Sequence, residues 1–270
     1  MSTELLEWLP RIDLFLMALA GGLLILLNLR LLNHWSSPKP LPLWSDVVAP
    51  AAIVIGVTLG AFATFQPTGM ILSGSWILVL GFVAGMLRLS LRDELHGAPF
   101  FGGLSALARR LGRGLPWLSV LIGVGLGLYA GSVLAVGAAR PAWSSMLLPV
   151  FFLGYGLAAA AGALVLARPD PDADAVRRTE VLYVALALAC GAAYIFSTPV
   201  AWSVGGLGGP GVVLWSVGLG VGLALPLVLA VGASTWRRLR PLADRATPWL
   251  ILLGGLVMRQ ALVAASQGRV

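Results

Sequence analysis

Long apolar segments alternate with short polar gaps along the whole chain. Each segment has about 17 to 23 mostly apolar residues, the length that an α-helix needs to cross a bilayer. A spanning segment must satisfy its own backbone hydrogen bonds, and these segments lack the alternating pattern of a barrel strand, so helices are expected. The pattern predicts a single membrane domain over residues 1–270 with eight transmembrane helices, at approximately 13–32, 47–65, 70–89, 117–138, 145–167, 181–197, 212–231 and 248–265.

The composition agrees with an all-α integral membrane protein. Hydrophobic residues make up 59% of the chain and charged residues 11%. Soluble domains have about 25% charged residues. The mean hydropathy of +0.92 points the same way. These values exclude an ordinary soluble domain.

The basic residues are concentrated in alternate gaps. The gaps after the first, third, fifth and seventh predicted helices hold fourteen of the 18 Lys and Arg residues. By the positive-inside rule these gaps are cytoplasmic, and both termini face outward. The high isoelectric point therefore reports membrane topology rather than nucleic-acid binding. Four basic residues fall on the predicted outer side: Arg11, Arg140, Arg259 and Arg269.

Residues that bind haem or metal ions are scarce. His34 and His96 both fall in cytoplasmic gaps, so no pair of intramembrane histidines is available for a b-type haem. Cys190 is the only cysteine. An iron–sulfur cluster needs about four thiolates, and a structural zinc site about four ligands. We therefore expect this chain to bind no haem, metal or iron–sulfur cluster, and any metal centre to belong to a partner.

One cytoplasmic gap has an amphipathic pattern. Residues 100–113 place apolar side chains beside Arg109, Arg110 and Arg113. This pattern is typical of a helix that lies on a membrane surface. The adjacent glycines at 102 and 103 weaken any helix there, so a solvated basic connector is an equal alternative.

Polar residues near the predicted outer ends of several helices form a candidate site. Such groups are costly in hydrocarbon and are functional candidates for that reason. Asp13 opens the first predicted helix, while Gln66 and Thr68 occupy the outward turn after the second. Tyr129 lies about 14 Å below the outer end of the fourth helix, and Arg259 roughly 10 Å below that of the eighth. Because these residues share one leaflet, we expect them to form one site.

Each candidate also has a structural explanation. Asp13 is explained equally well as an exposed N-cap that the positive end of the first helix favours. Tyr129 could be an interfacial aromatic residue, although its depth argues against this. For Arg259, bracing through backbone carbonyls or Asp13 is favoured over ligand contact. The helix glycines are expected to permit close packing rather than ligand binding: Gly21, Gly22, Gly123, Gly125, Gly127 and Gly131.

Four stretches of the sequence resemble a known family. They are ALAGG at 18–22, FQPTGMILSGSW at 65–76, LYAGSVLAVGAARPAW at 128–143 and LLGGLVMRQALVAASQ at 252–267. They fall at both ends and in the middle of the sequence. These stretches look like the corresponding parts of the NrfD-type membrane subunit of polysulfide reductases.

The resemblance implies two four-helix bundles in the cytoplasmic membrane of a bacterium or archaeon. It also implies a quinone pocket near the outer surface, next to a four-cluster ferredoxin-like iron–sulfur subunit that serves a molybdopterin catalytic subunit. Tyr129 matches the family tyrosine that hydrogen-bonds the quinone. Asp13 falls where the family has a histidine, and Pro10 where it has an asparagine.

The function implied by the resemblance is that of a membrane anchor in a respiratory oxidoreductase complex. The anchor would bind menaquinone or ubiquinone and exchange two electrons with the iron–sulfur partner, with Tyr129 binding the head group and Asp13 exchanging the proton. The protein alone is not expected to have a complete catalytic activity. Two alternatives stay open: a purely structural anchor, and a small-molecule or ion transporter. A transporter would normally have paired helix breaks, whereas Pro226 has no counterpart in the first half.

Overall fold

The computed structural model describes residues 3–32, 42–63, 69–95, 99–136, 145–167, 174–197 and 214–266, and all regular secondary structure in these ranges is helical. Each of the eight predicted ranges coincides with a long helical segment. The elements are α1 (Thr3–Leu32), α2 (Leu43–Ala63), α3 (Gly69–Leu89), η1 (Asp93–Leu95), α4 (Pro99–Leu111), α5 (Gly114–Val136), α6 (Leu147–Leu166), α7 (Asp174–Ser197), η2 (Leu214–Ala224), α10 (Leu225–Thr235), η3 (Arg237–Leu239) and α11 (Arg240–Ser266).

Three helices begin well before their predicted apolar segments. The first residues of α1, α7 and α11 are Thr3, Asp174 and Arg240. Hydropathy marks the residues that transfer favourably into hydrocarbon, but the backbone hydrogen bonding of a helix continues into polar residues. The polar flanks therefore extend these helices rather than end them.

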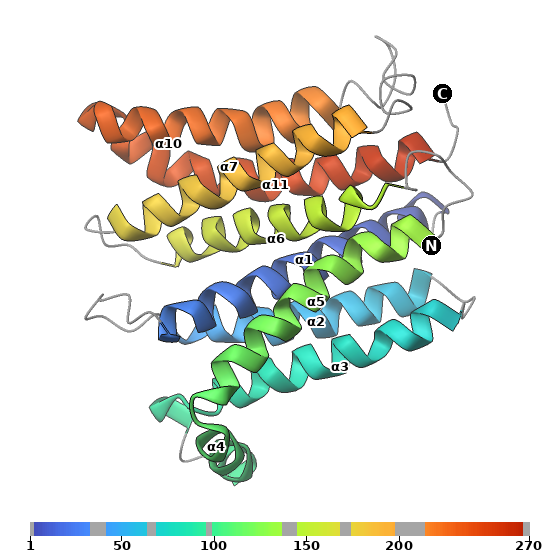
Figure 1. Ribbon diagram of the computed structural model, residues 1–270, viewed down its shortest axis with the longest axis vertical. Helices are drawn as coiled ribbons and strands as arrows, with labels where there is room; N and C mark the ends of the chain where they lie inside the picture. The colour runs from blue at the N-terminus through green and yellow to red at the C-terminus, as the bar shows by residue number, and fades with distance from the viewer. Residues whose placement is uncertain are drawn as a thin grey trace.

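The long helices of the described residues pack in two groups of four when η2 and α10 are taken as one continuous helix. The two groups lie one above the other in Figure 1. In the first group, α2 and α5 each contact both α1 and α3. In the second group, α6 contacts α7 and α11, and α11 packs against η2 and α10. The two groups meet where α6 contacts α1 and α5. Helices α1 and α6 are therefore central to the molecule.

Close packing around α1 depends on glycine. A Cβ atom added at Gly21 would lie 2.7 Å from the carbonyl oxygen of Gly123 in α5. One added at Gly22 would overlap the carbonyl group of Gly156 in α6. Protein interiors have no spare volume for such an atom. The predicted packing role of the helix glycines is confirmed, since a Cβ at Gly125, Gly127 or Gly131 would also meet a neighbouring helix.

The segment η2 is a π-helix that passes directly into the α-helix α10. Pro226 lies in the first turn of α10. Proline has no backbone N–H, so it interrupts the regular hydrogen bonding of the turn before it. The change of helix type thus falls beside the residue that the sequence marks as a helix breaker.

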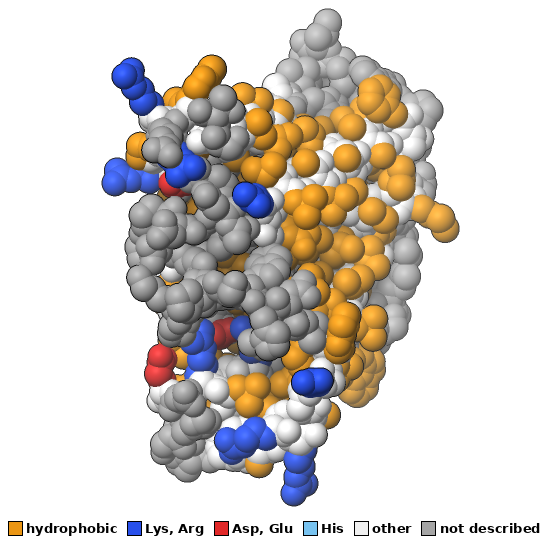
Figure 2. Space-filling view, turned by 60° about the vertical axis from the view of Figure 1, so that its left-hand side comes forward, with side chains coloured by type: hydrophobic (Ala, Val, Ile, Leu, Met, Phe, Trp, Pro, Cys, Tyr) orange, Lys and Arg blue, Asp and Glu red, His pale blue; other side chains and the backbone are white. Residues whose placement is uncertain are grey.

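Among the residues that the structure describes, five helices are long and apolar enough to cross a membrane: α1, α5, α6, α7 and the η2–α10 segment. Helices α2 and α3 contain shorter apolar stretches, Leu43–Thr58 and Trp76–Leu89. Figure 2 shows hydrophobic side chains over much of one face, with Lys and Arg side chains gathered towards one edge. These are features of a multi-pass helical membrane protein. The number of crossings, eight by sequence, stays a prediction.

The start of α1 and the end of α11 lie at the same end of the molecule (Figure 1). At the opposite end, α4 runs across the direction of the long helices, and α7 and α11 begin. The elements at this opposite end hold the exposed arginines of the described residues, which are Arg109, Arg110, Arg113, Arg178, Arg238 and Arg245.

Candidate functional site

Asp13 is a buried carboxyl group inside α1. Its side chain is only 8% exposed, and α1 begins at Thr3. The interpretation of Asp13 as an exposed N-cap that opens the helix is therefore wrong, because the helix already includes the residues from Thr3 onward. Its Oδ1 atom has no hydrogen-bond partner among the described residues. Burial of such an atom is costly, and helix formation alone does not explain why a carboxyl group occupies this position.

Arg259 in α11 is the largest fully buried side chain among the described residues, with 1% exposure. Its guanidinium carbon lies 5.1 Å from the centre of the Phe15 ring in α1 and 4.7 Å from that of Phe152 in α6. These distances are typical of cation–π contacts. Arg259 also interacts electrostatically with Asp13 and Tyr155. The arginine therefore connects α1, α6 and α11, through aromatic rings and an electrostatic interaction with Asp13; no hydrogen bond from it to a backbone carbonyl is seen among the described residues.

The contacts of Arg259 with its neighbours do not use all of its hydrogen-bond donors. Within the described part of the protein, the Nε and Nη1 atoms of Arg259 have no hydrogen-bond partner. A guanidinium group has five N–H donors. Arg259 therefore combines a fixed position with spare hydrogen-bonding capacity, and the bracing role does not exclude contact with a polar ligand.

Tyr129 in α5 is half-buried and packs against the hydrophobic core. It interacts electrostatically with Asp13. Seven residues separate Tyr129 from the end of α5 at Val136, which is roughly 10 Å along the helix axis. Tyr129 thus lies below the end of α5 and interacts electrostatically with the carboxyl group of α1.

Two neighbours of the site have no signal in the sequence. Gly56 in α2 faces Asp13, and a Cβ atom there would lie 3.0 Å from the Asp13 Oδ1 atom. Tyr155 in α6 is fully buried and donates a hydrogen bond to the backbone oxygen of Ile251, at 2.9 Å. Gly56 makes room for the carboxyl group, and Tyr155 ties α6 to α11 beside Arg259. One glycine and one tyrosine among many apolar residues give no pattern that predicts either role.

The structure brings three of the predicted site residues together, because Asp13 interacts with both Tyr129 and Arg259. Gln66 and Thr68 lie outside the described residues, as do Arg140 and Trp143. The grouped side chains offer a phenol donor, a carboxyl group that takes up or releases a proton, and a fixed cation. This set is suited to binding and deprotonating a small polar head group from within an apolar environment.

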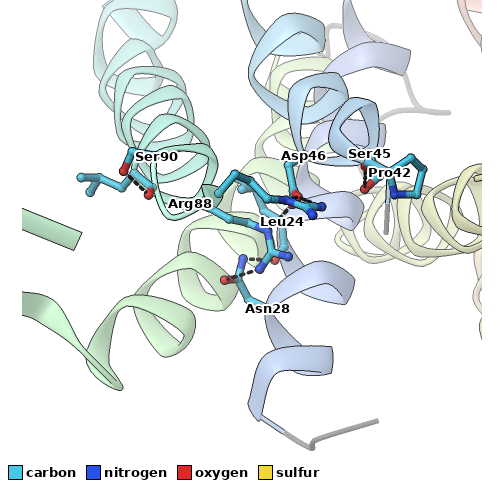
Figure 3. Close-up of polar contacts among 9 residues, drawn as sticks. Leu24, Asn28, Pro42, Ser45, Asp46, Arg88 and Ser90 are labelled. Atoms are coloured by element: carbon cyan, nitrogen blue, oxygen red, sulfur yellow. Dashed lines mark hydrogen bonds and ion pairs between the residues drawn. The ribbon is translucent and has the colours of Figure 1, made fainter. Parts of the chain in front are cut away.

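A second polar cluster lies in the same bundle, near the opposite ends of α1, α2 and α3 (Figure 3). The buried carboxylate of Asp46 in α2 accepts a hydrogen bond from Arg88 Nε at 2.6 Å and another from Arg92 Nε at 2.5 Å. Arg88 also donates to the side-chain oxygen of Asn28 at 3.2 Å, and Asn28 donates to the Leu24 carbonyl at 2.7 Å. This network connects α1, α2 and the end of α3, and this structural role explains its polar residues. The sequence did not predict the network because Asp46 and Arg88 are far apart in the sequence.

The described residues contain no group of three or more His, Cys, Asp or Glu side chains that could hold a metal ion. His34 and His96 lie outside the residues that the structure describes. The expectation that the protein binds neither metal nor haem stays a prediction.

No protein-family model matches the chain. Among curated proteins, a match of 182 residues with 23% identity is found to a protein of Wolinella succinogenes. The sequence is similar to the C subunit of polysulfide reductase. The match covers 58% of this chain and 56% of the relative, so the sequence spans little more than half the length of that protein.

The similarity to the polysulfide reductase C subunit confirms the resemblance that the four sequence stretches indicated. It says nothing about individual residues, so the roles of Asp13, Tyr129 and Arg259 rest on their geometry in this chain. Asp13 interacts electrostatically with both Tyr129 and Arg259, and the expectation that these residues build one site stays a prediction.

Proposed function

We propose that this chain is the membrane anchor and quinol- or quinone-binding subunit of a respiratory oxidoreductase complex. The supporting observation is the grouping of a buried carboxyl, a phenol and a buried cation in a protein similar to the polysulfide reductase C subunit. Such a grouping is costly in an apolar bundle, and Asp13 and Arg259 have hydrogen-bonding capacity left for a ligand.

In this proposal each residue has a distinct role. Tyr129 donates a hydrogen bond to one oxygen of the quinol head group, and Asp13 accepts the proton from a quinol hydroxyl. Arg259, held by Phe15 and Phe152, supplies a fixed positive charge beside Asp13. Oxidation of the quinol releases two electrons and two protons. The electrons pass to a cluster held by a partner subunit, and the protons leave through Asp13 towards the nearer membrane face.

The assembly and topology are part of the same proposal. We infer eight crossings with both termini on the outer, periplasmic side of a bacterial or archaeal cytoplasmic membrane, which places the site near the outer face. The expected partners are a four-cluster ferredoxin-like iron–sulfur subunit and a molybdopterin catalytic subunit. Metal centres belong to these partners in this proposal.

The direct test is replacement of Tyr129 by Phe in the assembled complex. The change removes one hydrogen-bond donor and keeps the ring, and such a bond contributes about 0.5–1.5 kcal/mol. We expect the quinol KM to rise several-fold, with complex assembly unchanged. Steady-state quinol oxidation with an artificial acceptor measures the effect.

A matched control is available in α7. Tyr183 is also a half-buried tyrosine that packs against the core, but it belongs to the other helix group. Tyr183→Phe should leave the quinol KM unchanged. An equal rise in both variants would mean that lost packing, not a bond to quinol, causes the change.

The proposed orientation predicts a labelling pattern for single cysteines in a Cys190→Ser background. Cysteines placed in the 66–69 turn or after residue 265 should react with a membrane-impermeant maleimide in intact cells. Cysteines at Arg110 or Arg240 should react only after permeabilisation, because basic gaps remain on the cytoplasmic side. The reverse pattern would contradict the orientation and move the site to the inner face.

A further inference from the structure

Helix α4 has an apolar side that the bundle does not cover. Its Leu104 and Ala108 pack against Leu87 of α3 and Leu115 of α5. Phe100 and Leu107, by contrast, are 69% and 47% exposed. Phe100, Leu107 and Leu111 are spaced by seven and four residues, which places them along one line of a helix surface. Of the two alternatives for residues 100–113, the structure has the amphipathic helix, which ends at Leu111, and part of its apolar face is exposed.

The exposed apolar line continues onto the neighbouring long helix. At the start of α5, Trp117, Leu118 and Leu121 are all exposed, with Trp117 at 62%. The backbone turns from α4 into α5 through Gly112, which has a positive φ of 50°. The uncovered side of α4 is thus continuous in sequence with apolar surface of a helix long enough to cross a membrane.

The polar side of α4 is basic, and α4 itself contains no acidic residue. Arg109 and Arg110 in its last turn and Arg113 after it are exposed. Arg109 donates a hydrogen bond to Ser105 Oγ at 3.0 Å, a neutral partner. No Asp or Glu occurs in residues 95–169. Of the acids that precede α4 in the sequence, Asp46 is already paired with Arg88 and Arg92, and η1 contains Asp93 and the exposed Glu94.

We propose that α4 and the turn after it form a binding surface for anionic phospholipids. Phe100, Leu107 and Leu111 enter the acyl-chain region, and Arg109, Arg110 and Arg113 bind the headgroup phosphates. An anionic phospholipid has both halves of the matching chemistry, a negative headgroup beside apolar chains, whereas a soluble anion has only one. The direction of α4 across the long helices is the direction of a helix lying in a membrane interface (Figure 1).

The first test compares lipid selectivity in the assembled complex. The Arg109→Gln, Arg110→Gln, Arg113→Gln triple variant is placed in nanodiscs containing phosphatidylglycerol and phosphatidylcholine with identical acyl chains. Native mass spectrometry then counts the lipids that remain bound. Each basic residue near an anionic surface contributes about fivefold in affinity, so we expect the preference for phosphatidylglycerol to fall at least tenfold.

A matched control removes the same charge elsewhere at this end of the molecule. Arg178, Arg238 and Arg245 are also exposed, in α7, η3 and α11. Their triple Gln variant should keep the preference within about twofold, because general surface attraction is screened and spread over many sites. An equal loss in both variants, or no loss in the α4 variant, would overturn the proposal.

Two further measurements separate lipid from other occupants. Inorganic phosphate in excess should not displace the retained phosphatidylglycerol; displacement would indicate a site for soluble anions. A fluorophore at Leu107→Cys, in the Cys190→Ser background, should be quenched by spin-labelled lipid in the assembled complex. Absence of quenching would show that protein, rather than lipid, covers α4, and would also overturn the proposal. None of these readouts depends on quinol turnover.

Discussion

Replacement of Asp13 by Asn should lower the rate of quinol oxidation by the assembled complex about 100-fold or more. Asparagine keeps the size of the side chain, and Gly56 still leaves room for it. It cannot accept a proton, and positioned proton transfer contributes about 10²–10⁴-fold to a rate. The measurement is kcat with saturating quinol, alongside the quinol KM, which should change much less than kcat.

Two companion variants make the Asp13 result interpretable. Asp13→Glu retains a carboxyl group and should recover part of the lost rate. Glu94→Gln removes a carboxylate that is exposed in η1, and should have no effect. Wild-type turnover in a stable Asp13→Asn complex would contradict proton exchange at Asp13 and favour the purely structural anchor.

Replacement of Gly22 by Leu should destabilise the fold strongly. Even the first carbon of a side chain at this position would overlap the Gly156 carbonyl and lie 2.9 Å from the Cβ atom of Ala160. The helices would have to separate where the two groups of four meet. Overpacking of a close-packed core costs about 1–3 kcal/mol, and we expect the upper end of this range. Unfolding in a denaturing detergent series measures the change.

A glycine-to-leucine replacement at a position with free space serves as the control for Gly22→Leu. A Cβ atom at Gly102 in α4 would meet nothing within 4 Å. Because glycine weakens a helix, Gly102→Leu should be neutral or stabilise by about 0.5–1 kcal/mol. Equal destabilisation of both variants would contradict the close approach of α1 and α6.

The hydrophobic pattern was sufficient to find the helices. Hydrocarbon burial requires long apolar runs whose backbone hydrogen bonds are internal, so each run coincides with a helix of the structure. The helix starts at Thr3, Asp174 and Arg240 were not predictable in the same way. Transfer free energy changes at the membrane boundary, but helical hydrogen bonding does not stop there.

The glycines were also only partly predictable: the sequence indicated their role in packing, but not which helices they contact. The density of glycine in the first and fourth predicted helices indicated close packing, because only small side chains let helix backbones approach each other. Which helices meet was decided by the tertiary structure. Gly21 faces Gly123 of α5, while the adjacent Gly22 faces Gly156 of α6, so neighbouring glycines serve different helices.

The sequence by itself determined that the protein is a helical membrane protein, that its basic residues are segregated, and that Asp13, Tyr129 and Arg259 are costly where they stand. These conclusions follow from the free energy of placing each residue in hydrocarbon, which depends on the residue type and on its position along the apolar segment, and both can be read from the sequence. Only the tertiary structure decided that Asp13 is buried, that Arg259 lies over Phe15 and Phe152, and that Asp46 pairs with Arg88. Such contacts depend on the relative position and rotation of helices far apart in the sequence, and the residue types along a single helix do not contain that information.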